Sequence, residues 1–99
     1  QRAADERARL AAIEHEKPDV VILDVMMPDI SGLEVLRYMR RQPNLASIPV
    51  IVVSAKSMPM DIKIGLDAGA SMYLTKPVGY RDLIQAVDQV LQGSDAPQI

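Results

Sequence analysis

Val20-Val21-Ile22-Leu23-Asp24-Val25-Met26-Met27-Pro28 is the stretch that decides the fold of this 99-residue chain. An unbroken apolar run with β-branched residues is typical of a strand that is buried on both faces, as in a parallel sheet covered by helices. In such sheets the ligand site lies outside the carboxyl ends of the strands. Because Asp24 stands near the end of the run, the pattern predicts a carboxylate in a functional position.

Two further strands are predicted, and each closes on a polar side chain. Ile48-Pro49-Val50-Ile51-Val52-Val53 closes on Ser54, and Ala70-Ser71-Met72-Tyr73-Leu74-Thr75 closes on Lys76. Each polar residue alone could be an ordinary strand-end cap. If the three strands are parallel, however, a carboxylate, a hydroxyl and an ammonium meet at one edge of the sheet. The sequence therefore predicts a polar site there.

Helices are predicted before and between these strands. The opening segment, rich in Ala, Arg and Glu, ends at Pro18, and an apolar stripe at helical spacing follows Gly32. A short helix ends at Gly69, and a last helix spans residues 80–91. In that last helix we expect five side chains to face the sheet: Leu83, Ile84, Val87, Val90 and Leu91. Three cations at the end of the second helix are predicted to be solvent-exposed: Arg37, Arg40 and Arg41.

Three segments carry a resemblance to a known family. Residues 18–32 resemble the phosphoacceptor segment of two-component response-regulator receiver domains, residues 48–55 their switch-hydroxyl strand, and residues 67–77 their last strand with its Lys-Pro ending. The resemblance implies an α/β, flavodoxin-like (CheY-like) doubly wound parallel sheet. We expect residues 1–91 to form a partial receiver domain, and residues 92–99 to be a C-terminal tail or linker stump.

The resemblance also implies a chemistry. Asp24 would take a phosphoryl group from a histidine kinase or phosphotransfer protein and become an acyl phosphate. Lys76 would pair with one phosphoryl oxygen and the Ser54 hydroxyl would donate to another. Tyr73 would change rotamer when Ser54 moves, and the peptide bond between Lys76 and Pro77 would be cis.

The family's Mg²⁺ site is only partly represented. Asp24 and the backbone carbonyl of Met26 would be ligands, but the acidic pair that normally ends the family's first strand is not present in this chain. The opening helix matches the family's second helix, so we expect the first strand, first helix and second strand to be lacking. Residues 20–25 would then be an exposed edge. We expect the chain to be a fragment of a longer receiver; the alternative is self-association through this strand.

Composition narrows the function classes. The chain has a net charge of −2 and only three aromatic residues, which argues against direct nucleic-acid binding by this domain. It has no cysteine, which excludes disulfides and is compatible with a cytoplasmic location. No apolar stretch approaches the roughly 20 residues that span a bilayer, so we expect no membrane role. An output domain beyond the C-terminus would fit the resemblance.

Three functions remain open. The first is a phospho-accepting signalling switch, favoured by the set of Asp24, Ser54, Tyr73 and Lys76. The second is a non-phosphorylated pseudo-receiver that serves as a protein-interaction module, favoured by the missing acidic pair. The third is a small enzyme with Asp24 and Lys76 as acid and base; no second catalytic carboxylate supports it, so we expect no enzyme activity. We favour the first function.

Overall fold

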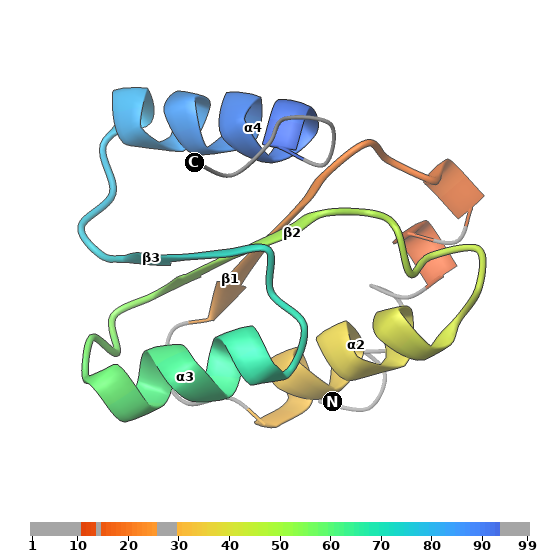
Figure 1. Ribbon diagram of the computed structural model, residues 1–99, viewed down its shortest axis with the longest axis horizontal. Helices are drawn as coiled ribbons and strands as arrows, with labels where there is room; N and C mark the ends of the chain where they lie inside the picture. Colours follow the sequence, from red (N-terminus) through yellow and green to blue (C-terminus); the bar gives the residue numbers. More distant parts are fainter. Residues whose placement is uncertain (1–10, 14, 26–29, 94–99) are drawn as a thin grey trace.

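Three parallel strands form the sheet, in the order β1-β2-β3. They are β1 (Val21–Val25), β2 (Val50–Ser54) and β3 (Met72–Thr75) in this computed structural model, which describes residues 11–13, 15–25 and 30–93 (Figure 1). The register places Asp24 beside Val53 and Ser54 beside Thr75. The carboxyl ends of the strands therefore lie at one edge, as predicted.

Helices cover both faces of the sheet. Figure 1 shows α2 (Ile30–Arg41) and α3 (Pro59–Asp67) on one face and α4 (Tyr80–Gly93) on the other. Residues 11–13 and 15–16 are also helical. The predicted α/β class with a parallel sheet is thus confirmed. None of the helices in the described ranges is both long and apolar enough to cross a membrane.

The central strand carries the core. Every residue of β2 is buried. Val50 and Val52 pack into the cluster with Leu36 and Met39 of α2, whereas Ile51 and Val53 pack with Ala86 of α4. Because alternate side chains of one strand enter two different clusters, both faces of β2 must be apolar. This explains the continuous run of aliphatic residues in the sequence.

The prediction for α4 is wrong at two positions. Ile84 is 43% exposed and Leu91 is 45% exposed, whereas Ala86 is buried and Val87 and Val90 pack beside it. Residues 83, 86, 87 and 90 form one stripe at helical spacing, and 84 and 91 fall on its flank. The small Ala86 is the buried residue of α4 that packs with Ile51 and Val53 of β2.

The prediction for the end of α2 is wrong at one position. Arg37 and Arg41 are exposed as expected, but Arg40 is half-buried. Its guanidinium donates three hydrogen bonds to backbone carbonyls of the loops that fold around the helix end. Burial lowers the pKa of Arg40 from its ordinary value.

Two further predictions concern the exposed edge of the sheet at β1 and the end of the last helix, α4. Within the described ranges β1 pairs with β2 only, and Ile22 on it is 44% exposed. Self-association through this edge stays a prediction. α4 continues to Gly93, two residues beyond the predicted end, and residues 94–99 of the predicted tail lie outside the described residues.

Candidate functional site

An ion pair joins the two outer strands at the carboxyl edge of the sheet. The Nζ of Lys76, just after β3, lies 2.8 Å from Oδ1 of Asp24 on β1. The Asp24 side chain is 61% exposed and that of Lys76 is 32% exposed, so the pair is open to solvent. The backbone N–H of Lys76 donates to the carbonyl of Ser54 at 2.8 Å. The Lys76–Pro77 peptide bond is cis.

Ser54 ends β2 between these two partners in the sheet, but its side chain is buried. It is 2% exposed, and its Oγ accepts a hydrogen bond from the backbone N–H of Lys56 at 3.1 Å. Its hydrogen-bond partner is therefore in the loop after β2, and neither Asp24 nor Lys76 binds its hydroxyl. The structure brings Asp24 and Lys76 into contact and leaves Ser54 bonded to the loop.

Tyr73 of β3 reaches the same loop. Its hydroxyl donates to the backbone carbonyl of Lys56 at 2.9 Å. Its ring lies against Gly65 of α3, where an added Cβ would come within 2.7 Å of ring atom Cδ2. The glycine therefore allows close approach of the ring to the helix. The loop, β3 and α3 meet at this one side chain.

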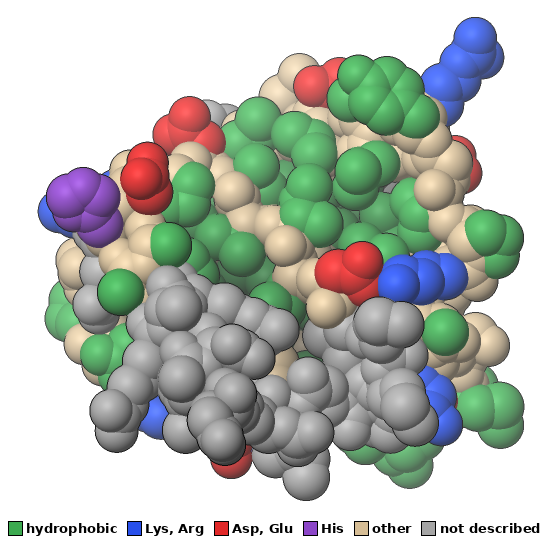
Figure 2. All heavy atoms as spheres, turned by 180° about the vertical axis from the view of Figure 1, so that it is seen from behind, with side chains coloured by type: hydrophobic (Ala, Val, Ile, Leu, Met, Phe, Trp, Pro, Cys, Tyr) green, Lys and Arg blue, Asp and Glu red, His purple; other side chains and the backbone are tan. Residues whose placement is uncertain are grey.

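A cavity of about 560 Å³ lies beside the ion pair, on the face covered by α4. Apolar side chains make most of its wall, including Ile22, Val53 and Leu83, with Asp24 and Lys76 at its margin. Figure 2 shows hydrophobic side chains gathered over the middle of the back of the molecule, with acidic and basic groups adjoining at their lower edge. An anion attached to Asp24 would thus meet the Lys76 ammonium next to an apolar surface.

The predicted Mg²⁺ ligands are only partly visible. Met26 lies outside the described residues, so its carbonyl is not placed. The described ranges contain no cluster of three or more His, Cys, Asp or Glu side chains that could hold a metal. Mg²⁺ is usually bound through one or two carboxylates plus waters and phosphate oxygens. One carboxylate, that of Asp24, provides too few ligands to define a Mg²⁺ site.

Two features of the site were missed by sequence reasoning. The Lys56 backbone is the shared partner of Ser54 and Tyr73, and nothing in a side-chain pattern marks a backbone group for that role. The second feature is Gly65 of α3, which lies against the Tyr73 ring. Its position in the middle of a helix, where glycine is unfavourable, was the available signal of a close contact.

Known proteins resemble this chain along most of its length. A family model described as "Response regulator receiver domain" matches residues 1–88. The chain is 42% identical over 79 residues to the alkaline phosphatase synthesis transcriptional regulatory protein SphR of Synechococcus elongatus, covering 80% of this chain and 30% of SphR. It is 37% identical over 93 residues to PhoP of Bacillus subtilis, which carries the same descriptive name, covering 94% of this chain and 38% of PhoP.

A solved structure has the same fold. The signal receiver domain of a signal transduction histidine kinase from Syntrophus aciditrophicus superposes with a TM-score of 0.75 at 32% identity. The match covers 94% of this chain and 70% of that one. The chain therefore spans about a third of the length of the two transcriptional regulators and most of the isolated domain.

Proposed function

Because the chain belongs to the response regulator receiver domain family of two-component signalling, we propose that it is a phospho-accepting switch with Asp24 as the acceptor. The observation that supports this most directly is the ion pair of Asp24 and Lys76 at the carboxyl edge of a parallel sheet. The carboxylate is exposed enough for a partner to reach it, and a cation stands beside it.

The proposed reaction is a phosphoryl transfer from a phosphohistidine of a histidine kinase or phosphotransfer protein. A carboxylate oxygen of Asp24 attacks the phosphorus, the P–N bond breaks, and its electron pair stays on the imidazole nitrogen. The product is an acyl phosphate. Such transfers depend mainly on positioning and on neutralising the equatorial oxygens. Lys76, now 2.8 Å from Oδ1, would supply a point charge for one of those oxygens.

Ser54 and Tyr73 would convert this event into a change of shape. A hydroxyl accepts and donates at once, so Ser54 can give its hydrogen to a phosphoryl oxygen. Because Ser54 is buried and bonded to Lys56, we expect its approach to the phosphoryl group to move the loop after β2. Tyr73 is bonded to the same residue and would change rotamer with it. Phosphorylation would then shift an existing equilibrium between two loop positions.

Mg²⁺ is the cofactor that the family implies. Asp24 and the carbonyl of Met26 would be ligands, but Met26 lies outside the described residues and the acidic pair is absent from the chain. The described residues do not make a complete Mg²⁺ site, so no reaction step is assigned to the metal. The second candidate is a pseudo-receiver that uses the surface for protein contacts without phosphorylation.

The lengths and names of the relatives support a proposal about the domain organisation of the protein. We propose that residues 1–91 are a partial receiver domain and that residues 92–99 lead toward an output domain. SphR and PhoP are named transcriptional regulatory proteins, and this chain matches only 30% and 38% of their lengths. The names of these relatives are those of regulators, which agrees with a signalling module and not an enzyme.

Intact mass with a small phosphodonor tests the proposal. Acetyl phosphate with Mg²⁺ should add one phosphoryl group to the protein, and Asp24→Asn should abolish the gain. Asp88→Asn, an exposed carboxylate on α4, is the matched control and should label normally. Labelling that persists in Asp24→Asn would reject Asp24 as acceptor. A folded protein that never gains the group would favour the pseudo-receiver.

A further inference from the structure

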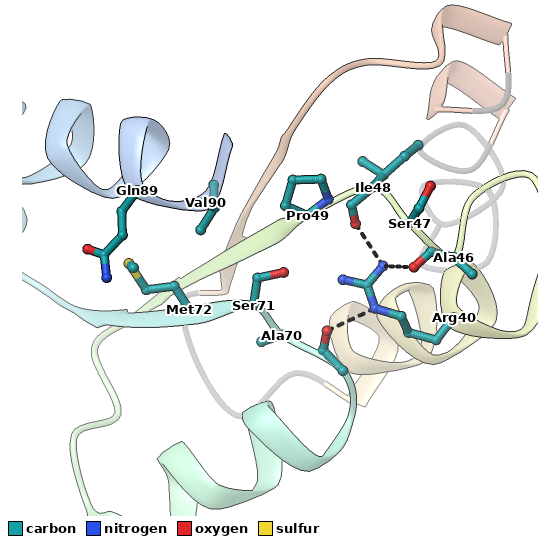
Figure 3. Close-up of a pocket in the computed structure, with 11 residues that line it drawn as sticks. Arg40, Ala46, Ser47, Ile48, Pro49, Ala70, Ser71, Met72, Gln89 and Val90 are labelled. Carbon is teal, nitrogen blue, oxygen red and sulfur yellow. Dashed lines mark hydrogen bonds between the residues drawn. The ribbon is translucent and has the colours of Figure 1, made fainter. Parts of the chain in front are cut away.

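A second cavity lies at the edge of the sheet opposite to Asp24. Its volume is about 480 Å³, within the common range for small-molecule sites. Residues just before β2 and β3 line it, together with the end of α2 and the last turns of α4 (Figure 3). The wall has a polar part, made by Arg40, Ser71 and Gln89, and an apolar part, made by Pro49, Met72 and Val90.

Only some of the N–H donors of the Arg40 guanidinium form hydrogen bonds with the described residues. Its Nε donates to the carbonyl of Gly69 at 2.9 Å, and its Nη1 donates to those of Ile48 and Ala46 at 2.7 and 3.2 Å. These bonds hold the planar group in one orientation. A guanidinium has five N–H donors, two of them on Nη2. Among the described residues nothing accepts from Nη2.

The charge of Arg40 is also without a counterion in the described ranges. The only ion pairs found there join Lys63 to Asp67 and Lys76 to Asp24. Three carbonyl dipoles offset part of the cost of burying the cation, but they carry no net negative charge. Burial lowers the pKa of Arg40, so the charged form is disfavoured by its surroundings. An anion in the cavity would reverse that effect.

Ser71 faces Arg40 across the cavity. Figure 3 shows the Ser71 hydroxyl and the Arg40 guanidinium pointing toward one another. The Ser71 Oγ accepts from the backbone N–H of Val50 at 3.1 Å, which orients the side chain and leaves its own hydrogen to donate. Gln89 from α4 borders the same space. Two donors on opposite walls, both fixed by other bonds, suit one small acceptor group between them.

From this arrangement we propose that the cavity binds a small organic oxyanion, with its carboxylate or phosphate between Arg40 Nη2 and the Ser71 hydroxyl. A short apolar body of the ligand would lie against Met72 and Val90. The site is at the opposite edge of the sheet from the phosphoacceptor, so it does not depend on the function proposed for Asp24.

Residue-resolved NMR of the protein, titrated with sodium phosphate, acetate and butyrate, tests this proposal. Sodium chloride at equal ionic strength is the reference. We expect saturable shifts of the Val50, Ala70 and Ser71 amides. Butyrate should bind more tightly than acetate, by roughly fourfold for each methylene that becomes buried. Binding of phosphate alone would identify a phosphate ligand, and binding of the carboxylates alone a carboxylate ligand; both results support an oxyanion site.

Gln89→Glu is the decisive variant, because it adds a negative charge to the wall and removes none of the hydrogen bonds described for the cavity. It should weaken anion binding by about fivefold, the effect of a like charge at roughly 4 Å in water. Gln85→Glu, one turn earlier on α4 and outside this cavity, should bind as the parent does. Equal affinity of the two variants would overturn the proposal. So would shifts confined to Asp24 and Lys76, or none that saturate.

Discussion

Ser54 and Tyr73 hydrogen-bond opposite ends of one residue. The Oγ of Ser54 accepts from the N–H of Lys56, and the hydroxyl of Tyr73 donates to the C=O of Lys56. The two side chains come from neighbouring strands, β2 and β3. The position of the loop after β2 is therefore determined jointly by both, and a displacement of Lys56 must change both bonds.

A double-mutant cycle measures this joint dependence. Ser54→Ala and Tyr73→Phe should each lower the free energy of unfolding by about 1 kcal/mol, since each removes one hydrogen bond. The double variant should lose less than the sum, by at least about 0.5 kcal/mol, because either single change already releases Lys56. Urea denaturation of the four proteins provides the values. Strict additivity would mean that the two bonds form independently.

Gly65→Ala tests the contact between the Tyr73 ring and α3. Alanine normally stabilises a helix interior by about 1 kcal/mol relative to glycine. Here the new methyl group would lie 2.7 and 2.8 Å from two ring atoms. We therefore expect a net destabilisation of about 1–3 kcal/mol, as for other overpacked sites.

The Tyr73→Ala background is the control for that experiment. Without the ring, the added methyl group meets no obstacle, and Gly65→Ala should become stabilising in thermal melts. If the substitution destabilises both backgrounds equally, the ring is not the cause of the strain.

Gly69→Ala and Gly79→Ala are a matched pair of substitutions in the segments just before and just after β3. Gly69 has φ +119°, and a Cβ there would lie 2.6 Å from Cγ of Arg40. Backbone strain and the clash should together cost about 1–3 kcal/mol. At Gly79 the nearest atom, Oδ2 of Asp82, is 3.5 Å away, so alanine should change stability by less than about 1 kcal/mol. If calorimetry found that both substitutions destabilise the protein equally, the strain and clash inferred at Gly69 would be wrong.

The sheet was predictable because its strands are apolar on both faces, a pattern that few other structures require. The meeting of Asp24 and Lys76 then followed from parallel topology alone. The direction of the Ser54 side chain did not follow, because a rotamer depends on a backbone partner, Lys56, that no sequence pattern marks. Arg40 was misjudged for a similar reason: its acceptors include the carbonyl of Gly69, 29 residues away. Ala86 was overlooked because a small side chain contributes little to an apolar stripe.

Lys76→Ala should separate the chemistry of the site from the stability of the fold. Its ion pair with Asp24 is open to solvent, and such pairs contribute about 0–1 kcal/mol, so the free energy of unfolding should fall by no more than that. The backbone bond from Lys76 to Ser54 does not involve the side chain and should persist. If Asp24 is the phosphoacceptor, phosphorylation should still be measurable, but the conformational response in the loop after β2 should be lost.

Lys63→Ala is the matched control for this variant. Lys63 forms an exposed ion pair with Asp67 at 2.9 Å, on α3 and apart from Asp24. Its loss should lower the free energy of unfolding by a similar small amount, while phosphorylation and the loop response stay intact. The loop response is monitored through the Lys56 amide signal in NMR spectra. A collapse of the thermal transition in Lys76→Ala alone would instead make Lys76 a structural residue. An unchanged loop response in Lys76→Ala would remove it from the proposed switch.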